Sequence, residues 1–194
     1  MTLFSIGYAT KSIGTLFKQL QEQEVSAVAD IRSVPYSRAF PDYHREALQT
    51  ALLDEGIQYV YLGEELGPRS KEDAHYDDTG QVQFDRLMQS RLFQQGIARL
   101  KAGMEKGLNI ALLCAEKDPA ICHRSLLVAH YLLVEEDIDV QHITHEGTLE
   151  SQADLEQRLI QLQGLQADLL TPAEDLASLA YQGQVQDRAY RKPA

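Results

Sequence analysis

Short apolar runs recur along the first three quarters of the chain and are separated by longer segments of mixed polarity. The run at residues 25–31 contains Ala27, Val28 and Ala29 without interruption, which is typical of a strand covered on both faces. The run at residues 3–6 ends at Gly7, and the run at residues 109–114 is the most apolar of all. We therefore predict five strands, at residues 3–6, 25–31, 57–62, 109–114 and 140–144.

Apolar residues at helical spacing fill the segments between these strands. In the first segment Ser12 is a capping residue, and Leu16 and Leu20 share one helix face. Gly56 ends the second helix. The alternation of strands and helices predicts a three-layer α/β fold, in which helices cover both faces of a mainly parallel sheet of about five strands. We predict these helices at residues 13–24, 44–55, 84–106 with a break near Ser90, and 122–136.

The pattern changes after about residue 146. Leu155 and Leu159 share an apolar stripe on a helix that Ser151 opens, and residues 171–174, Thr-Pro-Ala-Glu, are a typical helix start. Both helices are amphipathic, so we expect them to pack on the domain or on a partner. We predict an α/β domain at residues 1–146 and a helical extension at residues 147–194, in which residues 184–194 fray.

The composition is that of an ordinary globular protein, with 44% hydrophobic and 24% charged residues. The net charge of −11 argues against non-specific nucleic-acid binding, although it allows a local basic pocket for one anion. No apolar run approaches the roughly 20 residues that cross a bilayer, and the first residues do not resemble a signal peptide. Two cysteines suit a reducing compartment, so we expect a cytoplasmic protein without membrane contact.

Polar and reactive residues follow four of the predicted strands. In open parallel sheets, ligands bind outside the carboxyl ends of the strands. These residues should therefore meet in one site, and Arg69 would reach it from a long loop at residues 63–82. The candidates in chain order are Gly7, Tyr8, Asp30, Arg32, Ser37, Arg38, Arg69, Cys114, Glu116, Cys122, His123 and Arg124.

The segment at residues 114–124 is the most informative, because it joins an apolar strand to the start of a helix. A thiol at a helix start beside Arg124 favours its thiolate, so Cys122 is a candidate nucleophile or redox-active group. Glu116, Asp30 and His123 are candidates for proton transfer. Gly7, Tyr8, Ser37 and Cys114 complete the predicted binding surface, and the groups that would hold an anion are Arg32, Arg38, Arg69 and Arg124.

Structural interpretations of the same residues remain open. Cys114 ends an apolar strand and fits a buried, inert thiol, while Cys122 fits a small residue packed at a helix start. His123 and Arg124 would equally tie the helix to Asp30 or Glu116 by ion pairs. Asp30 and Arg32 alternate along a strand, so only one of them enters a pocket unless the strand has already ended.

Several established motifs do not fit. Cysteine phosphatases place a cysteine and an arginine six positions apart. Here Cys114 lies too far along the chain from Arg124, and Cys122 lies too close to it. The spacing of Cys114, Cys122 and His123 is not that of a zinc finger, so we predict no metal site. The sequence contains neither the dinucleotide glycine fingerprint nor the phosphate-loop lysine motif, and it identifies no cofactor.

An ordered set of short motifs carries a family resemblance. It comprises Ser5-Ile6-Gly7-Tyr8, residues 29–38, Gly56-Ile57-Gln58-Tyr59, Leu66-Gly67, residues 114–119, Cys122-His123-Arg124 and His142-Ile143. With this set the chain resembles the family known as domain of unknown function 488, over about residues 1–145. The resemblance implies an α/β fold and a shared pocket, and it supplies no reaction.

Two positions depart from the family pattern. Many relatives have His and then Ser or Thr after the first glycine, where this chain has Tyr8 and Ala9. Many also have a second glycine after Leu66-Gly67, where this chain has Pro68. The first departure argues against a mechanism that needs a histidine at that corner.

From the sequence we expect an enzyme that acts on a phosphate-bearing substrate, a nucleotide or a nucleic-acid-derived molecule, in an arginine-rich pocket at the strand ends. The alternative is a non-catalytic module that binds a nucleotide or anion, or that docks a protein through the C-terminal helices. A third interpretation is an architectural clamp between helix and sheet. The oligomeric state is not determined by the sequence.

Overall fold

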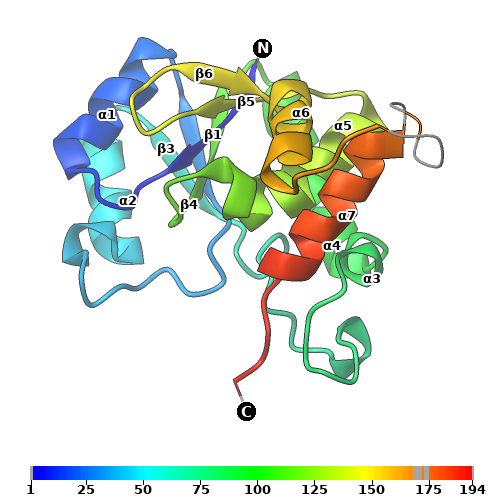
Figure 1. Ribbon diagram of the computed structural model, residues 1–194. Coiled ribbons are helices and arrows are strands. Elements are labelled where there is room, and N and C mark those ends of the chain that lie inside the picture. Colours follow the sequence, from blue (N-terminus) through cyan, green and yellow to red (C-terminus); the bar gives the residue numbers. More distant parts are fainter. Residues whose placement is uncertain (1, 168–171, 173–174, 194) are drawn as a thin grey trace.

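A six-stranded, mostly parallel sheet forms the centre of the molecule, in the order β3-β2-β4-β1-β5-β6 (Figure 1). The computed structural model describes residues 2–167, 172 and 175–193. The first five strands are parallel, and β6 pairs antiparallel with β5 at the edge. The strands are β1 (Leu3–Gly7), β2 (Ala27–Asp30), β3 (Gln58–Tyr61), β4 (Ile110–Cys114), β5 (Val140–Ile143) and β6 (Leu149–Ser151).

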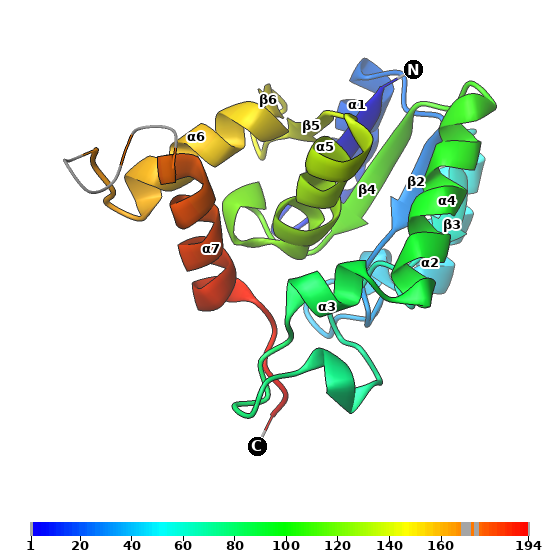
Figure 2. The same cartoon turned by 90° about the vertical axis from the view of Figure 1, so that its right-hand side faces the viewer.

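Helices cover both faces of the sheet, which confirms the predicted three-layer α/β fold (Figure 2). The helices α1 (Ile13–Glu22) and α2 (Arg45–Asp54) pack on one face. Strand β4 shows how the sheet separates two cores, because Ala111 and Leu113 face α1 and α2 while Ile110 and Leu112 face the other layer. That layer contains α3 (Phe84–Met88), α4 (Arg91–Glu105), α5 (His130–Glu136), α6 (Gln152–Leu162) and α7 (Leu176–Arg188).

Serine caps fix the starts of three helices. The side chains of Ser12, Ser90 and Ser151 each accept a hydrogen bond from a backbone N–H three residues further on, at 3.0–3.2 Å. These contacts satisfy amide groups that the first turn leaves without partners. The cap at Ser90 begins α4, so the predicted break between α3 and α4 is confirmed.

The segment predicted as one α-helix at residues 122–136 differs in its first half. Arg124–Ala129 form a π-helix, and only His130–Glu136 are α-helical. A short 3-10 turn, Pro119–Ile121, precedes them. The turns of a π-helix are wider than those of an α-helix, and they occur frequently at functional sites. Hydrophobic spacing over so few residues does not distinguish the two helix types.

The C-terminal part of the chain packs on the sheet layer rather than standing apart. Tyr181 donates to the Leu126 carbonyl at 2.8 Å, and Gln184 donates to the Ala120 carbonyl at 2.6 Å. Residues 184–193, which we predicted to fray, complete α7 and then run beside the 76–82 segment (Figure 1). The amide of Val82 donates to the Tyr190 carbonyl at 2.9 Å. The helix start predicted at residues 171–174 lies largely outside the described residues.

Within the described part of the chain, no helix combines the length and the apolar character needed to cross a membrane.

Candidate functional site

A cavity of about 230 Å³ lies at the carboxyl ends of the neighbouring strands β2 and β4. This is the edge at which a parallel sheet places its ligands. Cys114, Glu116 and His123 reach the cavity from the end of β4 and the turn that follows it. Arg69 reaches it from the loop after β3, and Arg188 reaches it from the last turn of α7.

Two thiols, a carboxylate and an imidazole meet beside this cavity, and we call these four residues the 114–123 cluster (Cys114, Glu116, Cys122 and His123). The two sulfur atoms, of Cys114 and Cys122, lie 2.7 Å and 3.0 Å from Oε2 of Glu116. Nδ1 of His123 lies 3.5 Å from the Cys114 sulfur and 4.0 Å from the Cys122 sulfur. The cluster therefore combines groups that transfer protons, attack electrophiles or bind metal ions.

The ionisable groups of the cluster shift one another's pKa values. Burial opposes ionisation of Glu116, yet the positive charge of His123 and the hydrogen bonds from the two thiols lower its pKa to about 2. Burial likewise opposes ionisation of Cys122, while the hydrogen bond from Cys114 and the charge of Arg124 lower its pKa to about 6. Burial and the neighbouring Cys122 raise the pKa of Cys114 well above its ordinary value. Cys122 is thus the more acidic thiol of the pair.

The ring of His123 is held in one orientation by the backbone. Its Nε2 lies 3.0 Å from the carbonyl oxygen of Ile31, at the end of β2. A carbonyl only accepts, so Nε2 carries the proton that is donated. In the neutral ring, Nδ1 then has a free lone pair on the side of the sulfur atoms. Burial opposes the charged ring, but Cys122 and Glu116 raise the pKa of His123 above its ordinary value.

Arg124 clamps the turn that carries Glu116. Its guanidinium donates to the carbonyl oxygens of Glu116 at 2.6 Å and Lys117 at 3.2 Å, and the residue is fully buried. Gly7 packs against the same turn, because a Cβ at this position would lie 1.8 Å from the Glu116 carbonyl oxygen. Arg124 and Gly7 are therefore supports of the cluster and do not line the cavity.

Asp30 and Arg32 are paired with each other. Strand β2 ends at Asp30, so the two side chains turn together instead of facing opposite sides of the sheet. The Arg32 guanidinium donates to both carboxylate oxygens of Asp30, at 2.8 Å and 2.6 Å. Tyr59 donates to the same carboxylate at 2.7 Å, and Arg32 also donates to the Tyr43 carbonyl at 2.8 Å. Arg32 lines the cavity with its charge already balanced, and Asp30 lies behind it.

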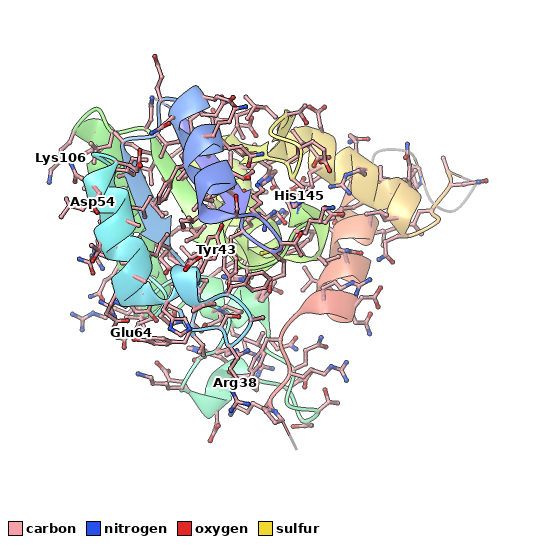
Figure 3. The ribbon with its side chains drawn as sticks, turned by 90° about the vertical axis from the view of Figure 1, so that its left-hand side faces the viewer. Arg38, Tyr43, Asp54, Glu64, Lys106 and His145 are labelled. Atoms are coloured by element: carbon pink, nitrogen blue, oxygen red, sulfur yellow. The ribbon has the colours of Figure 1, made fainter. Side chains whose placement is uncertain are left out.

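The remaining predicted site residues lie away from the cavity. Tyr8 is buried and stacks on Tyr43, with ring centroids 4.1 Å apart. Ser37 lies on the loop before α2, where its carbonyl bonds to His44 at 2.8 Å, and it does not line the cavity. Arg38 is exposed on the loop before α2, and Figure 3 shows it at the lower edge of the molecule, below Tyr43.

Two residues of the C-terminal segment line the cavity, and we did not predict either of them from the sequence. Arg188 ends α7, and Tyr190 follows it with its ring 4.8 Å from the guanidinium carbon of Arg69. Their place depends on the path of the chain beside the 76–82 segment, where Gln81 and Arg191 form a β-bridge. No sequence pattern near residue 188 predicts such a long-range contact.

Comparison with known proteins adds the family. The family model described as "Domain of unknown function DUF488" matches residues 12–132, which is more than half of the chain. The chain belongs to the DUF488 family. The matched region of this DUF488 protein contains the whole 114–123 cluster and Arg69, whereas Arg188 and Tyr190 lie beyond it. No curated protein matches the chain.

Proposed function

We propose that this DUF488 protein is an enzyme that binds a phosphate-bearing substrate, a nucleotide or a nucleic-acid-derived molecule, in the cavity at the ends of β2 and β4. One observation carries the proposal: Arg69 and Arg188 line the same cavity as Cys114, Glu116 and His123. Anion-binding and reactive groups thus converge from three separate parts of the chain. Such convergence in a concave site is the usual form of a small-molecule site.

Arg69 and Arg188 are the groups that would hold the anion. A guanidinium stays charged at all working pH values and matches the geometry of phosphate oxygens. Within the described residues, neither Arg69 nor Arg188 forms an ion pair with an acidic side chain. They differ in this from Arg32, which Asp30 neutralises. Of the four arginines predicted from the sequence to hold the anion, the proposal keeps Arg69, and it adds Arg188.

The thiol pair is the proposed reacting group. Cys122 has the lower pKa of the two thiols, while Cys114 is the cysteine that lines the cavity. Glu116 and His123 lie close enough to both sulfur atoms to accept or return a proton. Asp30 is not part of this proposal, since Arg32 and Tyr59 occupy its carboxylate oxygens.

A binding module without turnover is the second candidate. It is favoured by the burial of both sulfur atoms, since Cys114 and Cys122 are only 2% and 1% exposed. In such a module the cluster would stabilise the turn beneath the anion and would take no part in chemistry. The two candidates share the anion site and differ only in whether a product forms.

Anion binding is tested by thermal shift and calorimetry with inorganic phosphate, sulfate and a panel of nucleotides. We expect the wild-type protein to be stabilised by a ligand that binds the folded state. Arg69→Ala and Arg188→Ala should each weaken binding by about tenfold or more. Arg38→Ala is the matched control and should bind as the wild type does. Wild-type binding in the Arg69→Ala/Arg188→Ala double variant would refute the proposed anion site.

Turnover is tested separately, by incubation with phosphomonoesters, phosphodiesters and nucleotides and by detection of products with mass spectrometry. An enzyme of the proposed kind forms a product, and Cys114→Ser and Cys122→Ser abolish product formation while retaining anion binding. Binding without any product from the wild-type protein would support the binding module instead.

A further inference from the structure

The 114–123 cluster has the composition and the geometry of a metal centre. The four ligand atoms of Cys114, Glu116, Cys122 and His123 all lie within 4.8 Å of one another. Around a tetrahedral zinc ion, sulfur, nitrogen and oxygen ligands are about 3.4–3.8 Å apart, given the usual bond lengths. Of the sulfur-to-nitrogen distances, 3.5 Å lies within this range and 4.0 Å lies slightly above it. The carboxylate, at 2.7 Å and 3.0 Å from the sulfurs, would draw back slightly.

We propose that Cys114, Glu116, Cys122 and His123 bind a zinc ion. Two thiolates, an imidazole and a carboxylate form a mixed ligand set that zinc accepts in tetrahedral geometry. Hard cations such as magnesium and calcium prefer oxygen ligands alone, so they do not suit this set. Zinc binding would not depend on the identity of the substrate, and in this respect it stands apart from the proposed function.

The surroundings of the cluster are those of a metal site. The His123 ring donates its Nε2 proton to the Ile31 carbonyl, and metal-bound histidines commonly bond to a carbonyl in this way. The backbone amide of Arg124 donates to the Cys122 sulfur at 3.5 Å. Two thiolates and a carboxylate exceed the charge of a zinc ion by one negative charge. The fully buried guanidinium of Arg124, bonded to the Glu116 carbonyl, balances that charge.

The chain between the two cysteines explains why ligand spacing alone predicts no metal. Cys114 ends β4, and the 3-10 turn Pro119–Ile121 brings the chain back so that Cys122 lies beside it. Asp118 caps this turn by accepting a hydrogen bond from the Ala120 amide at 2.9 Å. The ligands are thus placed by a strand end and a turn of irregular backbone, and not by the short knuckle of a zinc finger.

The position of the ion would connect it to the cavity. Cys114, Glu116 and His123 line the cavity and Cys122 does not, so one side of the bound ion would face Arg69 and Arg188. Glu116 lines the cavity, and as the oxygen ligand of the set it is the one that a water molecule or a substrate oxygen would most readily replace. In the zinc-loaded protein the ion, acting as a Lewis acid on the anion, would replace the free thiol pair as the reacting group, and this role rests on the proposed anion site.

The first experiment measures zinc directly. Protein purified without chelators should contain about one zinc ion per chain by elemental mass spectrometry, and apoprotein should rebind zinc in competition with a chromophoric chelator. Replacement of zinc by cobalt(II) should give thiolate-to-cobalt charge-transfer bands together with a tetrahedral ligand-field spectrum. These spectra come from the wild-type protein, so they do not depend on whether a variant folds.

Variants then assign the ligands. Cys114→Ser, Cys122→Ser and His123→Ala should each weaken zinc binding by at least about 100-fold, because even residues that merely support metal ligands change affinity by 10–100-fold. His145→Ala is the matched control, since His145 lies on a different loop (Figure 3). Circular dichroism checks that each variant is folded.

Two results would overturn the zinc site. One is a folded wild-type protein that binds zinc no more tightly than the Cys114→Ser/Cys122→Ser double variant. The other is a disulfide between Cys114 and Cys122 in freshly purified protein, detected by its mass before and after reduction. Phosphate binding is measured on zinc-loaded and zinc-free protein in parallel. If the protein binds phosphate but not zinc, the zinc site is refuted and the proposed anion site is unaffected.

Discussion

Gly7 and Arg124 support one turn from two directions. A side chain at position 7 would collide with the Glu116 carbonyl, and the Arg124 guanidinium donates to that same oxygen. The turn has no regular hydrogen-bond ladder of its own, so its position depends on these contacts. The direction in which the Glu116 carboxylate meets the two sulfur atoms therefore follows from a glycine at the end of β1.

Gly7→Ala should destabilise the protein by about 1–3 kcal/mol, because the added methyl group overpacks the turn. Gly14→Ala is the matched control: the new methyl group meets only the Ser12 hydroxyl at 4.0 Å, and α1 gains helix propensity. It should leave stability unchanged or raise it by up to about 1 kcal/mol. Urea denaturation compares the two variants, and equal effects would contradict the proposed crowding at Gly7.

The thiol pair should titrate unevenly in the metal-free protein. Because the hydrogen bond from Cys114 and the charge of Arg124 outweigh burial, Cys122 should lose its proton with a pKa of about 6. Ultraviolet thiolate absorbance should therefore rise by one thiolate per chain as the pH increases through 6. Cys122→Ser should abolish this step, and Cys114→Ala should move it to higher pH by removing a donor. A wild-type protein that shows no thiolate until pH 8 would contradict this prediction.

At the scale of secondary-structure elements, His142 links β1, β5 and α6. It lies on β5 and is completely buried. Its Nδ1 accepts from the Ser5 hydroxyl of β1 at 2.6 Å, and its Nε2 bonds to Gln152 of α6 at 2.8 Å. A neutral ring satisfies both contacts, whereas a protonated ring leaves Ser5 without an acceptor at Nδ1. The neutral ring therefore fits the junction of β1, β5 and α6, and burial favours it over the charged ring.

This junction should make the fold sensitive to acid. Burial, and then the charge of Arg124, lower the pKa of His142 to about 3, while in the unfolded chain it is near 6.5. Below pH 6.5 the unfolded chain binds the extra proton, so stability should fall by up to about 1.4 kcal/mol per pH unit until about pH 3. His142→Asn, which does not titrate, should be less stable at pH 7 and should lose less on acidification. A difference between the two proteins that stays constant from pH 7 to pH 5, by urea denaturation, would contradict this.

The elements that the sequence predicted well are those with a strong local signal. The apolar run around Leu112, the cap at Ser12 and the helix break near Ser90 depend on neighbouring residues alone, and the structure confirms them. Strand β6 was missed because it has three residues and only one neighbouring strand. The π-helix Arg124–Ala129 was missed because its apolar residues also fit an α-helix.

The candidate site was predicted only in part, for a related reason. Cys114, Glu116, Cys122 and His123 follow one strand, so their proximity could be inferred from a short segment. Which arginines face the cavity depends on pairing in three dimensions. Arg32 pairs with Asp30 two residues away, and Arg124 donates to backbone carbonyls. Arg188 lines the cavity because the C-terminal segment folds back beside it. Residue type alone does not distinguish an arginine that lines the cavity from one that is paired inside the protein.

At the scale of the whole molecule, the C-terminal helices share their core with the sheet. Leu155 and Leu159 of α6 and Ala180 of α7 belong to the same apolar cluster as Leu3 and Leu112. The predicted boundary near residue 146 therefore separates segments of sequence, while the apolar core continues across it. We infer that the extension folds together with the rest of the protein.

A continuous core should unfold in one step. We expect a single calorimetric transition whose van't Hoff and calorimetric enthalpies agree, as for small two-state domains. Far-ultraviolet and tyrosine near-ultraviolet circular dichroism should show the same midpoint. Two separate transitions, or an early loss of helical signal before the tyrosine signal changes, would show that residues 147–194 unfold independently.

The π-helix Arg124–Ala129 also limits how this protein can vary. Each residue advances a helix by about 100°, so a change of length by one residue rotates everything beyond it by that angle. Arg124 faces the turn at Glu116, and Leu132 faces the core in the α-helix that follows. A single deletion between them would restore ordinary helical spacing but aim one of these side chains in the wrong direction. We therefore expect natural variation here to exchange one side chain for another and to conserve the number of residues.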